Sequence, residues 1–201
     1  NDYLGIPKFQ SDLAERTTKP GVVTGMAWTA AGGDILFVES SKMKGKGLLT
    51  LTGQLGDVMK ESAAAAFTYV KSHTDILGLK ENFAEKMDIH VHCPAGAIPK
   101  DGPSAGVGMF TSLVSLLTDK PVKSKLSMTG EITLRGNVLA IGGVKEKVTA
   151  AHRAGIKTVI LPFANKRDLE EIPEHIKKDL KFHFAKEVMD VIDVAIPDLK
   201  K

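Results

Sequence analysis

The chain has 201 residues, of which 43% are hydrophobic and 25% are charged, and its formal net charge at pH 7 is +3. This length suits one domain with a hydrophobic core, and the composition is typical of a globular protein. So small a net charge gives no reason to expect a nucleic-acid partner, and no apolar run approaches the roughly 20 residues of a membrane span. Because Cys93 is the only cysteine, an intramolecular disulfide is excluded.

The first part of the chain is predicted to be a linker followed by β-structure. Residues 1–20 are mostly polar and end in Thr-Thr-Lys-Pro, which is typical of a linker. Strands are expected at residues 22–29 and 34–39, around an Ala-Gly-Gly turn. A third strand, at residues 48–52, is expected to pair with the second. Because the chain begins with Asn1, we expect it to be part of a longer protein.

Three lysines, Lys42, Lys44 and Lys46, precede the third expected strand. They lie beside two glycines, and we expect them to form the solvated tip of a hairpin. Contact with a phosphate or a nucleic acid is the alternative.

A helix is predicted at residues 57–72, which include a run of four alanines. Residues 87–93 then alternate between apolar and polar side chains, as a half-buried strand does. His90 and His92 share its polar face and could ligate a metal ion, but no third ligand follows at a suggestive spacing. We therefore expect no metal and place this polar face near the loop of Asp101.

The C-terminal half is predicted to alternate between strands and helices. No internal repeat and no Walker A pattern occurs, so the sequence gives no basis for nucleotide binding by this chain. The expected strands are 126–132, 138–141, 158–161 and 180–184, and the expected helical segments are 143–154, 168–172 and 186–194.

Ser104 lies in a glycine- and proline-rich turn. Residues 100–106 read KDGPSAG and run into a small and apolar stretch that predicts a buried helix at residues 104–117. Unpaired N–H groups and the helix dipole at such a start favour a developing oxyanion. Gly102 and Gly106 allow close backbone approach, and Pro103 stiffens the turn. The alternatives are that Ser104 only caps the helix, or that the turn cradles a phosphate.

Lys147 falls on the apolar face of the helix expected at residues 143–154. At about 100° per residue, Val144, Val148 and the alanines form one stripe, and Lys147 lies inside it, whereas Lys145 projects to the polar side. Desolvation lowers the pKa of a buried lysine, and a lysine with a pKa near 7 is a usable general base for a serine hydroxyl. The alternative is a side chain that extends its amine to solvent along the apolar surface.

Three segments in one order identify a family. Residues 99–106 read PKDGPSAG, residues 128–136 read MTGEITLRG, and residues 141–147 read IGGVKEK. With them the chain resembles the proteolytic domain of bacterial Lon proteases, from about Val22 to Val194. The resemblance implies an α+β fold (α/β mixed). Such a fold contains mixed sheets and β-hairpins with helices that flank them.

The resemblance also implies roles for individual residues. Ser104 would be the nucleophile, Lys147 the general base and acid, and Thr129 the hydroxyl that orients the lysine. Asp101 matches an acid that pairs with the lysine in a resting form, although a turn-capping aspartate is the alternative. His90 and His92 match supporting positions.

Substrate would be an unfolded, damaged or regulatory protein, bound as an extended strand. We expect its main chain to pair with an edge strand near Trp28. Backbone N–H groups near Asp101–Ser104, in the turn that includes Gly102, Pro103, Ala105 and Gly106, are expected to stabilise the oxyanion.

For the whole protein, the resemblance implies an ATPase module before this domain, with residues 1–20 as its end and connector and residues 21–201 as the protease domain. ATP and magnesium would bind there, with no cofactor in this chain. A homohexamer in the cytoplasm is expected, with a mitochondrial matrix origin as the alternative. Two other functions stay open: a catalytically silent, ring-forming module of the same fold, and a phosphate-binding domain of kinase type.

Overall fold

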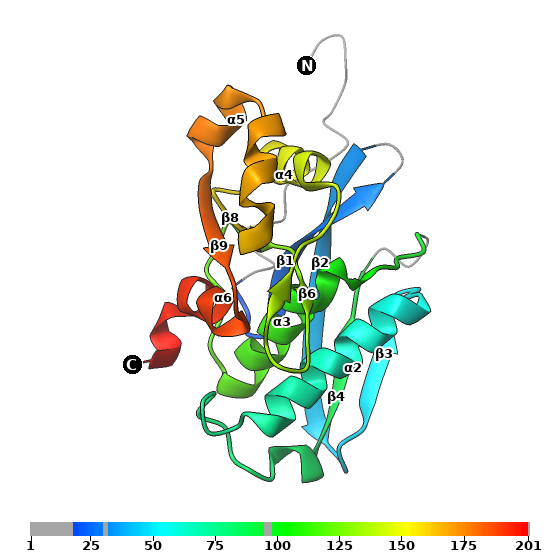
Figure 1. The fold of residues 1–201 in the computed structure, drawn as a ribbon. Coiled ribbons are helices and arrows are strands. Elements are labelled where there is room, and N and C mark those ends of the chain that lie inside the picture. The colour runs from blue at the N-terminus through cyan, green and yellow to red at the C-terminus, as the bar shows by residue number, and fades with distance from the viewer. Residues whose placement is uncertain (1–17, 30–31, 95–97, 201) are drawn as a thin grey trace, which may run out of the picture.

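The computed structural model describes residues 18–29, 32–94 and 98–200 (Figure 1). The linker expected at residues 1–20 therefore lies almost entirely outside the described residues. Within these ranges the chain forms a seven-stranded mixed sheet in the order β3-β4-β2-β1-β5-β8-β9 and a separate two-stranded sheet of β6 and β7. Helices pack on both faces of the large sheet, which gives the α+β architecture that the family resemblance implies.

The N-terminal strands make the antiparallel part of the sheet. β1 (Val22–Thr29) pairs with β2 (Gly32–Lys44) along its whole length, and β4 (Met87–His92) pairs with the far end of β2. The alternation predicted for residues 87–93 is confirmed, because Ile89, Val91 and Cys93 are buried.

The pairing expected for the third strand was wrong. β3 (Leu49–Thr52) does not pair with β2 in the described sheet but runs parallel to β4, which separates the two. The Asp88 carboxylate fixes this arrangement, because its Oδ1 accepts the N–H groups of Lys46 (2.7 Å) and Leu48 (2.9 Å). Lys42 and Lys44 thus lie in β2 itself, paired with β4, and only Lys46 lies in the connection to β3. The three lysines do not form the tip of a hairpin.

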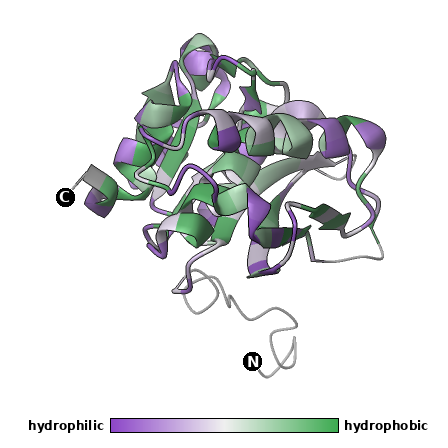
Figure 2. Cartoon of the chain, turned by 90° about the horizontal axis from the view of Figure 1, so that it is seen from below, coloured by the Kyte–Doolittle hydropathy of each residue, from purple (hydrophilic) through white to green (hydrophobic). Residues whose placement is uncertain are grey.

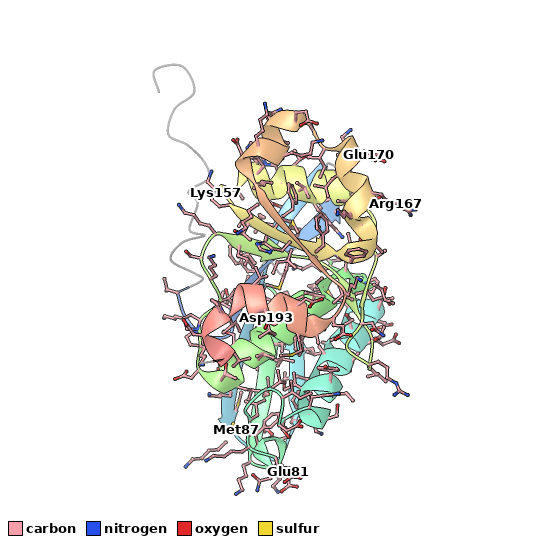
Figure 3. The ribbon with its side chains drawn as sticks, turned by 60° about the vertical axis from the view of Figure 1, so that its left-hand side comes forward. Glu81, Met87, Lys157, Arg167, Glu170 and Asp193 are labelled. Atoms are coloured by element: carbon pink, nitrogen blue, oxygen red, sulfur yellow. The ribbon has the colours of Figure 1, made fainter. Side chains whose placement is uncertain are left out.

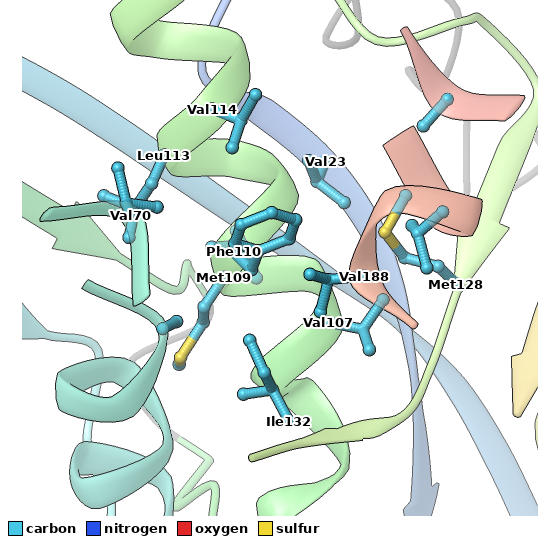
Figure 4. Close-up of a cluster of buried hydrophobic side chains, with 14 of the residues drawn as sticks. Val23, Val70, Val107, Met109, Phe110, Leu113, Val114, Met128, Ile132 and Val188 are labelled. Carbon is cyan, nitrogen blue, oxygen red and sulfur yellow. The ribbon is translucent and has the colours of Figure 1, made fainter. Parts of the chain in front are cut away.

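One face of the sheet is covered by α2 (Asp57–Ser72), α3 (Gly106–Thr118) and α6 (Val188–Ala195). The helix predicted at residues 57–72 is confirmed, and α3 is buried along nearly all its length, as its small and apolar sequence indicates. Figure 4 shows Phe110 of α3 close to side chains of the neighbouring elements in this core. In Figure 2 the strands are largely hydrophobic, whereas hydrophobic and hydrophilic residues alternate along the helices.

The other face carries a second hydrophobic cluster beneath α4 (Val144–Arg153), which contacts both β1 and β2. The strands that complete the large sheet here are parallel to β1: β5 (Leu126–Met128), β8 (Thr158–Pro162) and β9 (Lys181–Ala185). Charged side chains project outward from several elements, among them Arg167, Glu170 and, on α6, Asp193 (Figure 3).

The remaining elements are short. The expected strand at 126–132 is divided into β5 and β6, since the chain leaves the large sheet after Met128. A 3-10 helix, η3, replaces the single helical turn expected at residues 168–172, and the sequence reading missed α5. The elements not yet named are β6 (Glu131–Ile132), β7 (Val138–Leu139), η1 (Phe83–Glu85), η2 (Pro103–Ala105), η3 (Phe163–Glu171), α5 (Glu174–Asp179) and η4 (Pro197–Lys200).

Among the helices that the structure describes, none has the length and apolar character needed to cross a bilayer.

Candidate active site

Ser104 lies in η2, a single 3-10 turn that leads directly into α3. Gly102 precedes it at φ 120°, a backbone conformation that side chains with a Cβ rarely adopt. The N-cap of α3 is Ala105, and no side chain caps that helix start. The reading of Ser104 as the helix cap is therefore wrong, and its hydroxyl is not used in that way.

The main chain of Ser104 is tied to the segment that follows β5. Its carbonyl oxygen accepts the N–H of Gly130 (2.9 Å) and the Oγ1 hydroxyl of Thr129 (3.1 Å). The N–H of Val107 in turn donates to the carbonyl oxygen of Gly130 (3.0 Å). These bonds hold the serine turn and Thr129 in a fixed relation to each other.

Lys147 is buried in the first half of α4, with 3% of its surface exposed, while Lys145 is exposed. The stripe predicted from the helical period is confirmed, because Val144, Val148 and Ala151 are buried with it. The alternative, in which the lysine extends to solvent, is wrong. Burial lowers the pKa of the Lys147 amine from 10.5 to about 8. In the described part of the chain, no carboxylate lies within ion-pair distance to oppose that shift.

Thr129 connects the lysine to the serine. Lys147 Nζ donates to Thr129 Oγ1 over 3.4 Å, and the same hydroxyl donates its proton to the carbonyl oxygen of Ser104. Because its only proton is used there, the threonine oxygen presents a lone pair to the amine. No hydrogen bond joins Ser104 Oγ to Lys147 Nζ among the described residues, and Thr129 links the lysine side chain to the main chain of Ser104. Catalytic hydrogen bonds are often long or absent in unliganded active sites.

Asp101 is bound to backbone N–H groups. Its Oδ1 accepts the N–H of Gly102 (2.8 Å) and the N–H of Met59 (3.0 Å) in the first turn of α2. The N-cap of α2 is Gly56, which has no side chain, so Asp101 supplies the missing cap from a distant part of the sequence. Of the two alternatives from the sequence, this geometry matches the capping aspartate.

The N–H groups available to an oxyanion follow from these bonds. The N–H of Gly102 is used by Asp101, and Pro103 has none, which leaves the N–H groups of Asp101 and Ser104 in this segment. Gly106 allows the close packing of the helix start, because a Cβ there would lie 2.6 Å from Ser62 Oγ and 2.7 Å from a methyl group of Ile132.

His90 and His92 bind a different residue. His90 Nε2 and His92 Nδ1 each lie 2.7 Å from Thr52 Oγ1 on β3. Within the described residues, no hydrogen bond connects either ring to Ser104, Lys147 or Thr129, and no group of three or more His, Cys, Asp or Glu side chains could hold a metal ion.

The family model of the Lon protease (S16) C-terminal proteolytic domain matches residues 1–198. The chain belongs to this family.

Curated relatives agree with that match. The Lon protease of Desulfosudis oleivorans is 60% identical over 195 residues, which cover 97% of the chain and 24% of the relative. The Lon protease of Anaeromyxobacter dehalogenans is 60% identical over 197 residues (98% and 23%), and Lon protease 4 of Sorangium cellulosum is 58% identical over 196 residues (98% and 24%). The chain spans about a quarter of the length of these relatives. The resemblance inferred from the sequence motifs is confirmed.

Trp28 lies beside the start of the lysine helix of this Lon domain. Its side chain is 60% exposed at the end of β1, and a Cβ on Gly143 would lie 2.8 Å from its Cδ1. Gly143 is the N-cap of α4. The sequence reading placed Trp28 only by its strand, and the contact with Gly143 adds its position relative to Lys147.

Two residues that contact the lysine helix or the segment before it were missed. Gly33 was interpreted as part of a turn, but it lies in β2 directly against the backbone of α4. Asn165 binds the segment before α4 through its side chain. Glycine in a strand signals close backbone approach and could have indicated the first, whereas no local pattern indicates the second.

Proposed function

We propose that this Lon-family domain is a serine endopeptidase in which Ser104 is the nucleophile and Lys147 is the general base and acid. The observation that carries the proposal is a buried lysine amine with a lowered pKa and no carboxylate partner among the described residues, bound to the hydroxyl that also binds Ser104. With a pKa of about 8, roughly a tenth of these amines are neutral at pH 7 and able to accept a proton.

The reaction follows from these positions. The neutral Lys147 amine takes the proton of Ser104 Oγ as that oxygen attacks the scissile carbonyl carbon. The carbonyl oxygen becomes an oxyanion, for which the N–H groups of Asp101 and Ser104 are the donors in reach, each worth about 3–4 kcal/mol in such sites. The Lys147 ammonium then protonates the leaving amine, and the peptide C–N bond breaks to give an ester on Ser104.

Hydrolysis of this ester uses the same groups in reverse. Water attacks the ester carbonyl while Lys147 accepts a proton from it, and the ammonium returns that proton to Ser104 Oγ as the acid product leaves. Thr129 keeps the amine directed throughout, because a hydroxyl binds it without adding a negative charge that would raise its pKa.

The substrate class is an extended polypeptide. β1 pairs with β5 only at Gly25 and Met128, so beyond Gly25 the strand diverges from β5, next to the start of α4. A peptide could add to this edge through main-chain bonds with little demand on its sequence, with Trp28 beside it.

The activity of the whole protein is part of the proposal. Since the chain spans about a quarter of its relatives, an ATPase module that binds ATP and magnesium would precede it, with residues 1–20 as connector and residues 21–201 as the protease domain. A cytoplasmic homohexamer that degrades unfolded, damaged or regulatory proteins is the expected assembly. His90 and His92 would support the β3–β4 edge through Thr52.

A labelling experiment tests the proposal directly. A fluorophosphonate or a peptide boronate should form an adduct on Ser104, located by mass spectrometry, and Ser104→Ala and Lys147→Ala should each abolish peptide cleavage in a folded protein. Lys145→Ala is the matched control, because Lys145 is exposed on the same helix. No adduct in the intact chain would favour a silent, ring-forming module, and phosphate or ATP binding without an adduct would favour the phosphate-binding alternative.

A further inference from the structure

Asn165 binds both main-chain groups of one residue ahead of the lysine helix. It lies in η3 with 4% of its surface exposed. Its Oδ1 accepts the N–H of Ile141 (3.0 Å), and its Nδ2 donates to the carbonyl oxygen of Ile141 (2.9 Å). One side chain thus provides the two bonds that a neighbouring strand would otherwise provide.

Asp168 fixes the orientation of this amide. Asn165 Nδ2 also donates to Asp168 Oδ2 over 2.6 Å. Only the NH2 group can donate to both a carbonyl and a carboxylate, so the side chain has one satisfactory orientation. Loss of the amide would leave both main-chain polar groups of Ile141 without these partners.

The segment between Ile141 and Lys147 also packs against Trp28 and Gly33. It contains Gly142 and then Gly143, which adopts φ 68° and is the N-cap of α4 with no side chain to cap the helix. The N–H of Lys147 donates to the carbonyl oxygen of Gly143 (3.0 Å), so the lysine lies in the first turn after these two glycines. The position of the first turn therefore depends on the bonds to Ile141 together with the packing against Gly33.

We propose that Asn165 is a positioning residue for the Ser104–Lys147 reaction, which holds the start of α4 so that the Lys147 amine stays buried and within reach of Thr129. This inference rests on the proposed function for its effect on cleavage, but its effect on Lys147 is measurable without any cleavage. When the two bonds between Asn165 and Ile141 are removed, the first turn of α4 moves and water reaches the Lys147 amine.

The test is Asn165→Ala in the full chain, with two measurements. The first is peptide cleavage against pH. We expect kcat to fall roughly 10- to 100-fold with KM changed by less than about twofold, because a small misplacement of a catalytic group costs rate. The rising limb of the rate should move upward from pH 8. The second is the NMR titration of the labelled Lys147 side chain, whose midpoint should move in the same direction.

Two further variants separate positioning from general loss of stability. Asp190→Ala removes a capping box at the start of α6 and should lower the melting temperature while leaving both pH midpoints in place. Asp168→Ala leaves the two bonds to Ile141 available and should shift the midpoints less than Asn165→Ala does. It also provides a milder variant if the alanine at position 165 does not fold.

The outcomes distinguish this inference from the proposed function. Unchanged pH midpoints in folded Asn165→Ala and Asp168→Ala would overturn the positioning role, even if cleavage by the native chain is observed. If the Lys147 titration shifts in Asn165→Ala but the native chain cleaves no peptide, the positioning role of Asn165 is supported and the peptidase proposal is overturned.

Discussion

Gly33 lies directly against Glu146: a Cβ on Gly33 would be 2.0 Å from the carbonyl oxygen of Glu146 and 3.0 Å from the Cβ of Ala150. Glu146 is the residue before Lys147, so any side chain at position 33 must push the backbone of α4 away from β2. We predict that Gly33→Ala destabilises the fold by about 1–3 kcal/mol, as overpacking typically does. It should also reduce peptide cleavage by more than the unfolded fraction explains, measured by denaturation and kcat on one preparation.

Gly142→Ala is the matched control for this substitution. Nothing lies within 4 Å of a Cβ on Gly142, and its φ is not among the positive values. Its stability and cleavage rate should stay close to those of the native chain. If the two alanines behaved alike, the close approach at Gly33 would not be what positions the helix.

Thr129 is a second residue at which the candidate site can be altered without substituting Ser104 or Lys147. Thr129→Val keeps the shape but removes the hydroxyl that Lys147 Nζ and the Ser104 carbonyl share. We expect kcat to fall roughly 10- to 100-fold, since the amine loses its direction toward the serine. Thr129→Ser keeps the hydroxyl and should retain most of the rate. Equal losses in both variants, measured on one peptide, would mean that the methyl group and not the hydroxyl matters.

The sequence predicted those features that depend on local periodicity. The burial of Lys147 followed from the 3.6-residue period of α4, and the bounds of β1 and α2 followed from their apolar patterns. Family motifs then indicated Ser104 and Thr129 as partners of that lysine.

Features that depend on distant contacts were not predictable in this way. The pairing of β3 with β4 rather than β2 is set by Asp88, about 40 residues further along the chain. The capping of α2 by Asp101 is equally non-local, because the acceptor and Met59 lie 42 residues apart. No pattern within one segment records such contacts, so a local reading assigns the nearest partner and misses the true one.

Two substitutions of Asp101 distinguish a structural role of its side chain from an electrostatic one. Asp101→Ala removes the acceptor for the N–H groups of Met59 and Gly102 and should cost about 0.5–2 kcal/mol of stability, as the loss of an N-cap does. Asp101→Asn keeps an oxygen in that place and removes only the charge. We therefore predict near-native stability and an unchanged pH dependence of cleavage for the asparagine variant. A lowered pH midpoint in that variant would instead support a direct charge interaction between Asp101 and Lys147.

The pKa of Lys147 predicts how stability depends on pH. The folded-state pKa is about 8 and the ordinary value is 10.5, so between these values the unfolded chain binds more protons than the folded chain. Stability from this group therefore rises as pH increases from 8 to 10.5, by roughly 3 kcal/mol, and is constant at lower pH, where both states are protonated.

Lys147→Met isolates this contribution, because methionine fills the same apolar space without a titrating group. We expect the variant to be more stable than the native chain at pH 7, since the charged amine no longer has to be buried, and this advantage to shrink steadily between pH 8 and pH 10.5. Urea unfolding of both proteins across that range measures the difference, in which the titration of all other groups cancels. If the difference in stability is the same at every pH, Lys147 keeps an ordinary pKa. Its amine would then be protonated at neutral pH, and the proposed general base would be ruled out.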